Sequence, residues 1–330
     1  MALLALLRII ATLMIYLHHH PILFLQFPNF DFQREMHMGV SLFFSLSGFL
    51  LMQKYGLSSK FSYQKYYENR FFKIFPLYWF VLLVVILGQK TTEINAILIN
   101  VLLLQGLWDN AQIWFIQPTW SLTVELIFYL LLPIFVRILA YNKLFFVIIC
   151  FFVAAFLAYE EAYFLLFNTI LGRSLDFLVG MLIAMQKEQL DKKIAALKIK
   201  PNTLLLVSSV LLIGLLTYYV SAQKGAEIGI YAAFPAFIYT CVQPFVIFLL
   251  LYALIRKNEI TPNIFMGKTL LQVGRYTYAF FLIHQGFIQT FLWQIFPNRL
   301  INFILLCAIS VFLFTFVENK IVKWHSASKP

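Results

Sequence analysis

The sequence predicts an all-α, polytopic membrane protein. Of its 330 residues, 62% are hydrophobic and only 12% are charged, which is about half the charged fraction of an ordinary soluble domain. Apolar runs follow one another from end to end, and a helix needs about 20 such residues to cross about 30 Å of hydrocarbon. Because no segment is left over for a soluble module, we expect one transmembrane domain over residues 1–330.

Eleven apolar segments are candidate spans, at residues 2–27, 37–53, 74–89, 94–107, 119–137, 144–158, 163–186, 202–222, 230–255, 269–293 and 300–319. The segment at 94–107 is short and holds a central Asn100. Both features are typical of a re-entrant or interfacial piece and not of a crossing. About ten transmembrane helices therefore remain.

The charge distribution supports this count, since a crossing at 94–107 would reverse the orientation of everything after it. With a cytoplasmic N-terminus and no crossing there, eighteen Lys and Arg residues lie inside and four lie outside, namely Arg34, Lys90, Lys224 and Arg299. A crossing would move thirteen cations outside, which the positive-inside rule disfavours. We therefore expect both termini to be cytoplasmic. We interpret the net charge of +11 as a topology signal, and we expect no nucleic-acid partner.

Three arginines, Arg8, Arg173 and Arg275, remain within the predicted spans. An ionisable group at membrane depth costs at least a few kcal/mol, so each arginine is a functional-site hypothesis. Arg8 and His19 are eleven positions apart, or about 1100° of helical rotation, which places both on one helix face about 16 Å apart along the axis. An interfacial histidine cluster with a snorkelling arginine would explain the same spacing.

The neighbouring histidines do not form a metal site with His19. His18 and His20 are rotated about 100° to either side of it. The three imidazoles cannot converge on one ion, so we expect no metal.

An ordered set of motifs extends along the chain. It consists of R-x10-H at 8–19, GVSLFFSLSGFL at 39–50, NRFFKIFPLYW at 69–79, WSLTVELIFY at 120–129, RSLDFLVG at 173–180, the stretch Tyr278–His284, and Glu318. This set resembles the acyltransferase-3 family of bacterial integral membrane acyltransferases over essentially the whole chain. Ser47-Gly48 lies within the second motif, and close helix packing is the default interpretation of such small residues in membranes.

The resemblance implies a ten-span domain in the bacterial inner membrane. Such a domain takes an acyl group, usually acetyl, from acyl-coenzyme A on the cytoplasmic side. It transfers the group to a hydroxyl of a cell-surface or lipid-linked glycan. The expected partners are therefore acetyl-coenzyme A or another acyl-coenzyme A as donor, a glycan or lipid-linked sugar as acceptor, and membrane lipids.

The resemblance also assigns roles to individual residues. His19 would be the general base for the acceptor hydroxyl or an acyl-carrying nucleophile. Arg8, Arg70 and Lys73 would bind the donor phosphates. Arg70 and Lys73 would point the same way if their segment is helical, although ordinary positive-inside anchoring explains them too.

Glu125 would orient or charge His19, with Arg173 as one possible partner of its carboxylate. Trp120, Tyr129 and Arg173 would bind substrate, although aromatic belts at the membrane interface also explain Trp120 and Tyr129. Ser41 stands where the family usually has Asp, so any carboxylate function at that position has to come from elsewhere.

Two other classes of function remain open on the sequence alone. A transporter or flippase would use Arg8, Glu125, Arg173 and His19 as a proton or substrate path. A catalytically silent relative that recognises a lipid or sugar would explain Ser41.

Overall fold

The computed structural model describes residues 2–20, 26–27, 30–57, 61–223, 229–260 and 264–327. In these ranges the chain is helical apart from turns, loops and one short ladder, in which Gln26–Phe27 (β1) pairs antiparallel with Phe30–Asp31 (β2). The helices are α1 Ala2–His19, α2 Gly39–Leu51, α3 Tyr63–Gln89, α4 Ile94–Val101, α5 Trp120–Tyr159, α6 Tyr163–Asn168, α7 Ile170–Ala196, α8 Pro201–Ala222, α9 Ala233–Phe237, α10 Gln243–Ile260, α11 Ile264–Ile283, α12 Phe287–Ile295, α13 Arg299–Leu313 and α14 Asn319–Ala327. The predicted all-α fold class is confirmed.

Eight helical stretches of the described chain are long and apolar enough to cross a membrane, so the protein is a multi-pass membrane protein. One of them, residues 117–159, contains the two predicted spans 119–137 and 144–158. Its helix α5 is kinked between these two spans, at Asn142 (φ −152°, ψ 89°). The predicted span at 269–293 is interrupted: α11 ends at Ile283 and α12 begins at Phe287, with Gly286 between them at φ 92°. The count of ten stays a prediction.

The short segment near 94–107 is too short a helix to cross a bilayer. α4 has 8 residues, or about 12 Å. It ends in a tight reversal with Leu103 at φ 57°, where Leu104 N donates to Ile99 O at 3.0 Å and Leu103 N donates to Asn100 O at 2.9 Å. The Asn100 side chain is buried and donates to the carbonyl of Ile113 at 2.6 Å. The polar residue in this apolar run therefore stabilises the return of the chain.

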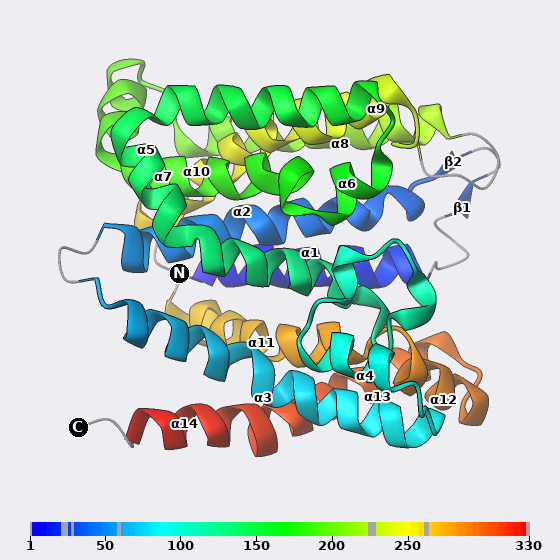
Figure 1. Ribbon diagram of the computed structural model, residues 1–330. Helices are drawn as coiled ribbons and strands as arrows, with labels where there is room; N and C mark the ends of the chain where they lie inside the picture. The colour runs from blue at the N-terminus through cyan, green and yellow to red at the C-terminus, as the bar shows by residue number, and fades with distance from the viewer. Residues whose placement is uncertain are drawn as a thin grey trace. The chain divides into compact units, whose positions relative to one another are not determined.

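The chain divides into two compact units, of which the first comprises residues 1–59 and 132–274. Here α1 and α2 run side by side (Figure 1), and α2 packs closely on α7. Two glycines allow this approach: a Cβ on Gly48 would lie 2.1 Å from the carbonyl oxygen of Phe177, and one on Gly180 would lie 1.9 Å from that of Ser45. The packing role expected for Gly48 is confirmed.

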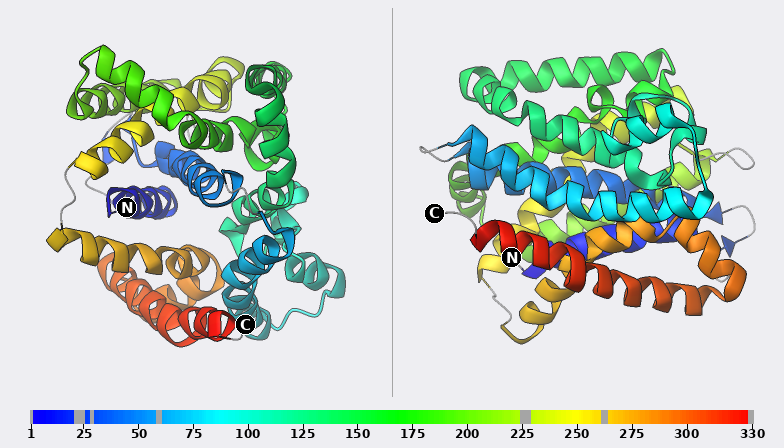
Figure 2. Two further views of the ribbon diagram at one scale, coloured as in Figure 1. Left: turned by 90° about the vertical axis from the view of Figure 1, so that its left-hand side faces the viewer. Right: turned by 60° about the horizontal axis from the view of Figure 1, so that its bottom comes forward.

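The second unit comprises residues 60–131 and 275–330. α12 turns into α13, and α14 continues beside α3 (Figure 2). Two fully buried tyrosines of α3 satisfy backbone carbonyls within this unit. Tyr66 donates to Tyr129 O at 2.9 Å, and Tyr78 donates to Asn100 O at 2.7 Å. Buried hydroxyls of this kind need such partners, and these bonds tie α3 to α5 and α4.

Candidate functional site

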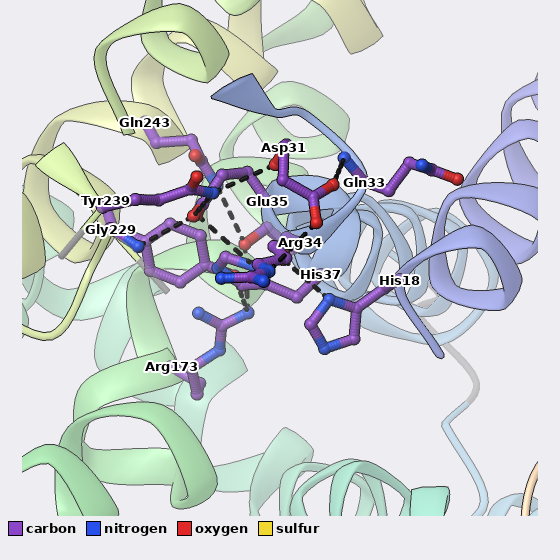
Figure 3. A network of polar contacts seen from close by, with 12 residues as sticks. His18, Asp31, Gln33, Arg34, Glu35, His37, Arg173, Gly229, Tyr239 and Gln243 are labelled. Carbon is purple, nitrogen blue, oxygen red and sulfur yellow. Dashed lines mark hydrogen bonds and ion pairs between the residues drawn. The ribbon is translucent and has the colours of Figure 1, made fainter. Parts of the chain in front are cut away.

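A network of polar side chains lies inside the first unit (Figure 3). Its members come from the end of α1, the segment that leads into α2, α7, and the segment around α9 and α10. Figure 3 labels His18, Asp31, Gln33, Arg34, Glu35, His37, Arg173, Gly229, Tyr239 and Gln243. A polar network is costly among apolar helices unless its members satisfy one another, so the contacts of each member decide what it can do.

Arg173 is the centre of the buried charge in this network, with 1% of the residue exposed. Its Nη2 lies 3.2 Å from Oδ2 of Asp176, and it donates to Ser41 Oγ at 3.0 Å and to the Tyr239 hydroxyl at 3.4 Å. The Gln243 amide also donates to Ser41 Oγ, at 3.1 Å. A carboxylate that compensates Arg173 is therefore Asp176, one turn further along α7, and the pairing of Arg173 with Glu125 stays a prediction.

The predicted catalytic histidine is the last residue of α1, so Arg8 and His19 belong to one continuous helix as expected. Both are half-buried. The ring centroid of His18 lies 4.7 Å from that of His19 and 5.6 Å from that of His37, and the His37 ring lies 5.0 Å from Tyr239. A row of titratable rings thus leads from His19 into the network.

A shared backbone acceptor fixes two of these rings. Nδ1 of His18 donates to the carbonyl oxygen of Arg34 at 2.7 Å, and Nδ1 of His37 donates to the same oxygen at 3.1 Å. With Nδ1 as the donor, a neutral imidazole keeps Nε2 as an acceptor. Sequence reasoning missed this function of His18 and His37, since nothing in the sequence shows that they share the Arg34 carbonyl.

The segment before α2 is anchored by a buried carboxylate. Glu35 is fully buried, and its Oε1 accepts hydrogen bonds from Gln223 Nε2 at 2.8 Å and from Gly229 N at 2.8 Å. Nε of Arg34 forms an ion pair with Asp31 at 3.0 Å. These contacts hold the carbonyl on which His18 and His37 converge.

The second unit contains the other predicted site residues, starting with Arg70, Tyr129 and Glu125. The Arg70 guanidinium lies 5.5 Å from the centroid of the Tyr129 ring, and the Tyr129 hydroxyl donates to the Glu125 carboxylate. Trp120 is the half-buried first residue of α5. A cation, an aromatic ring and a carboxylate therefore follow one another from α3 to α5.

Lys73, like Arg70, is a cation that lies close to an aromatic ring and a carboxylate. It lies on α3 three residues after Arg70, as the sequence predicted, and it forms an ion pair with Glu318. Lys73 Nζ also lies 5.7 Å from the Tyr278 ring centroid. Glu318 is 3% exposed and closes a π-helical turn, Phe314–Glu318, a feature frequent at functional sites. Lys73 can bind a further anion only by sharing or leaving this carboxylate.

Comparison with known proteins identifies the class to which this arrangement belongs. Apolar helices with charged groups buried among them define a membrane protein with an internal polar site. A family model for an acyltransferase domain matches residues 2–318, so the chain belongs to the acyltransferase-3 family and is a membrane acyltransferase. Neither the search of curated proteins nor that of solved structures gave a match.

Proposed function

We propose that this membrane acyltransferase moves an acyl group, most simply acetyl, from acyl-coenzyme A to a hydroxyl of a cell-surface or lipid-linked glycan. The donor would bind from the cytoplasm at a bacterial inner membrane, with both termini of the chain on that side. The observation that carries the proposal is the pairing of Arg8 and His19 about three turns apart on one helix, in a chain of this family.

In this proposal His19 works on the acceptor hydroxyl. Acting as a base, it takes the hydroxyl proton while the oxygen attacks the thioester carbonyl. The carbon–sulfur bond then breaks, and the coenzyme A thiolate leaves and takes up the proton. Acting as a nucleophile, His19 would first carry the acyl group itself, and an acyl-histidine would accumulate without acceptor.

Cations and aromatic rings would hold the two substrates. Arg8, Arg70 and Lys73 supply positive charge for the phosphates of coenzyme A, and Glu318 keeps Lys73 in position before the donor binds. Trp120 and Tyr129 would contact the acyl group or the sugar. Glu125 would supply the negative charge of the reaction centre. Arg173, already held by Asp176 and Ser41, would support substrate binding through Tyr239 and the row of histidines.

The test is mass spectrometry of surface glycans from host cells that express the wild type, His19→Ala or His20→Ala in equal amounts. The matched control is His20→Ala, which removes the same side chain one position beyond α1. We expect an added acyl mass with the wild type and the control, and none with His19→Ala. Acylation that survives in His19→Ala would overturn the catalytic role of His19.

A host without an acceptor would give identical spectra throughout. Coenzyme A binding by the purified protein separates that case from a failed proposal. We expect binding by the wild type and by His19→Ala, and weaker binding by Arg70→Ala, which removes a phosphate ligand. No binding by the wild type would contradict the proposed donor.

A further inference from the structure

A cavity of about 260 Å³ in the second unit is separate from the residues assigned above. It lies where the end of α3, the segment at 114–117 and α12 meet. Its volume is slightly below the usual range for pockets that enclose a whole drug-sized ligand. The cavity is therefore suited to one unit of a larger molecule, with the remainder outside.

The side chains that line the cavity are uncharged, and they combine polar groups with aromatic rings. Three carboxamides, Gln89, Gln117 and Gln294, stand with the hydroxyl of Thr290 and the aromatic rings of Trp114, Phe115, Phe287 and Phe291. Each carboxamide offers both donors and an acceptor, which suits hydroxyl groups. Aromatic rings suit the apolar faces of a sugar ring. None of these lining residues carries a charge that would select a phosphate or a carboxylate.

The wall of the cavity is held in place before any ligand binds. Trp114 Nε1 donates to the carbonyl of Gln105 at 2.9 Å, and the backbone N–H of Phe115 donates to the Asn100 side chain at 3.4 Å. The Gln105 amide in turn donates to Thr119 Oγ1 at 2.6 Å. Both Asn100 and Gln105 are fully buried. Preorganised walls of this kind lower the entropy that binding costs.

The opposite wall depends on two glycines. Gly286 has φ 92°, which lets the chain break between α11 and α12. A Cβ on Gly88 would lie 2.2 Å from Cζ of Phe287, so a larger residue at this position would displace the ring from its place against α3. The stacked pair of Phe287 and Phe291, with centroids 6.4 Å apart, forms an aromatic surface beside the carboxamides.

We infer that this cavity binds an uncharged sugar unit of the acceptor. The inference rests on the proposed function and deepens it, because the topology predicted from charge places the end of α3 and the 90–118 segment outside, where a surface glycan is. Gln117 and Gln294 would hydrogen-bond sugar hydroxyls while the aromatic rings cover the ring face. The lack of charge would select neutral sugars over acidic ones.

The first experiment measures binding by the purified full chain, with quenching of tryptophan fluorescence as the signal. The probes are neutral gluco-, galacto- and manno-oligosaccharides, with oligogalacturonate as the acidic counterpart. The test variant is Gln117→Ala/Gln294→Ala, in which two exposed side chains are truncated. The matched control is Gln112→Ala, an exposed glutamine of the same loop that does not line the cavity.

We expect a neutral oligosaccharide to quench the wild type and the control equally. The double variant should need about tenfold more sugar, as the loss of two hydrogen bonds implies, and Trp114→Phe should lose the response. Equal titrations for all variants, a response to oligogalacturonate alone, or no response to any neutral probe would overturn the inference.

Acylation assays separate this inference from the proposed function. Where the glycan is acylated, the double variant should raise the KM for the acceptor about tenfold and leave the KM for the donor unchanged. Unchanged acceptor KM would overturn the cavity and leave the acyltransfer proposal standing. Neutral sugar binding without any acylation would support the cavity and contradict the proposed function.

Discussion

At the scale of single residues, the stability of the first unit depends on the charge balance around Arg173. Arg173 and Asp176 are 1% and 3% exposed, so neither charge is stabilised by water. Their attraction offsets the loss of hydration only while both are present and hydrogen-bonded. Ser41 supplies a hydroxyl 3.0 Å from the guanidinium. The carboxylate of this cluster comes from α7, and α2 supplies the hydroxyl.

We predict that the carboxylate that compensates Arg173 can be moved from position 176 on α7 to position 41 on α2. Asp176→Asn leaves a buried guanidinium without its counter-charge and should cost about 3–5 kcal/mol in the free energy of unfolding. Ser41→Asp/Asp176→Asn moves the carboxylate from α7 to α2, beside the same Nη2 of Arg173, and should recover most of that loss. The measurement is thermal unfolding of the purified protein in detergent.

The control for this exchange is Ser41→Asp alone. It should also destabilise the protein, because two carboxylates would then face one guanidinium. Equal unfolding temperatures for Asp176→Asn and the wild type would contradict the assignment of Asp176 as the partner of Arg173.

At the scale of elements, the contact between α2 and α7 holds the Arg173 cluster together. Ser41 lies on α2 and Arg173 on α7, so the 3.0 Å hydrogen bond between them depends on how closely the two backbones approach. Close contacts between membrane helices rely on small residues. Gly48 and Gly180 supply them, each against a backbone carbonyl of the other helix.

We predict opposite effects on stability when alanine replaces a glycine in this contact and a glycine outside it. In Gly180→Ala the new Cβ would lie 1.9 Å from the carbonyl oxygen of Ser45, which forces the helices apart and should cost several kcal/mol. In Gly214→Ala, within α8, a Cβ would meet nothing within 4 Å. Alanine should there stabilise the helix by up to about 1 kcal/mol. Thermal unfolding of both variants checks the contrast, and similar unfolding temperatures would refute it.

The elements show how far the sequence could predict the fold. Apolar runs indicated helices correctly, because only helices satisfy the backbone within a bilayer apart from closed barrels. The gap between the predicted spans at 119–137 and 144–158 corresponds to the kink at Asn142. The break at Gly286 was missed, since an apolar run around one glycine looks the same whether or not the helix continues.

At the scale of the whole molecule, long-range pairs explain what the sequence could not predict about the site. Arg8 with His19 and Arg70 with Lys73 were predicted because helical periodicity relates near neighbours. The hydrogen bond from Gln223 to Glu35 and the ion pair of Lys73 with Glu318 join residues 188 and 245 positions apart. No local pattern encodes such pairs, which depend on tertiary packing.

The short helix α4 constrains the topology of the whole chain. A helix of 8 residues cannot cross about 30 Å of hydrocarbon, so the chain should return to the side from which it entered. Tyr141, which is 94% exposed at the kink in α5, should then face the cytoplasm with the cations Arg137 and Lys143. A crossing at α4 would place all three outside against the positive-inside rule.

Labelling of single cysteines with a membrane-impermeant maleimide distinguishes the two topologies. Replacing Cys150, Cys241 and Cys307 by serine gives the background, and Tyr141→Cys, Asp109→Cys and Glu160→Cys are introduced one at a time. In intact cells we expect Asp109→Cys and Glu160→Cys to react, and Tyr141→Cys to react only after permeabilisation. If α4 crossed the membrane, Tyr141→Cys would react in intact cells while Glu160→Cys would be protected. A crossing at α4 would also place residues 114–117 on the other side of the membrane from the end of α3. The proposed acceptor cavity, which both segments line, could then not face outward as a whole.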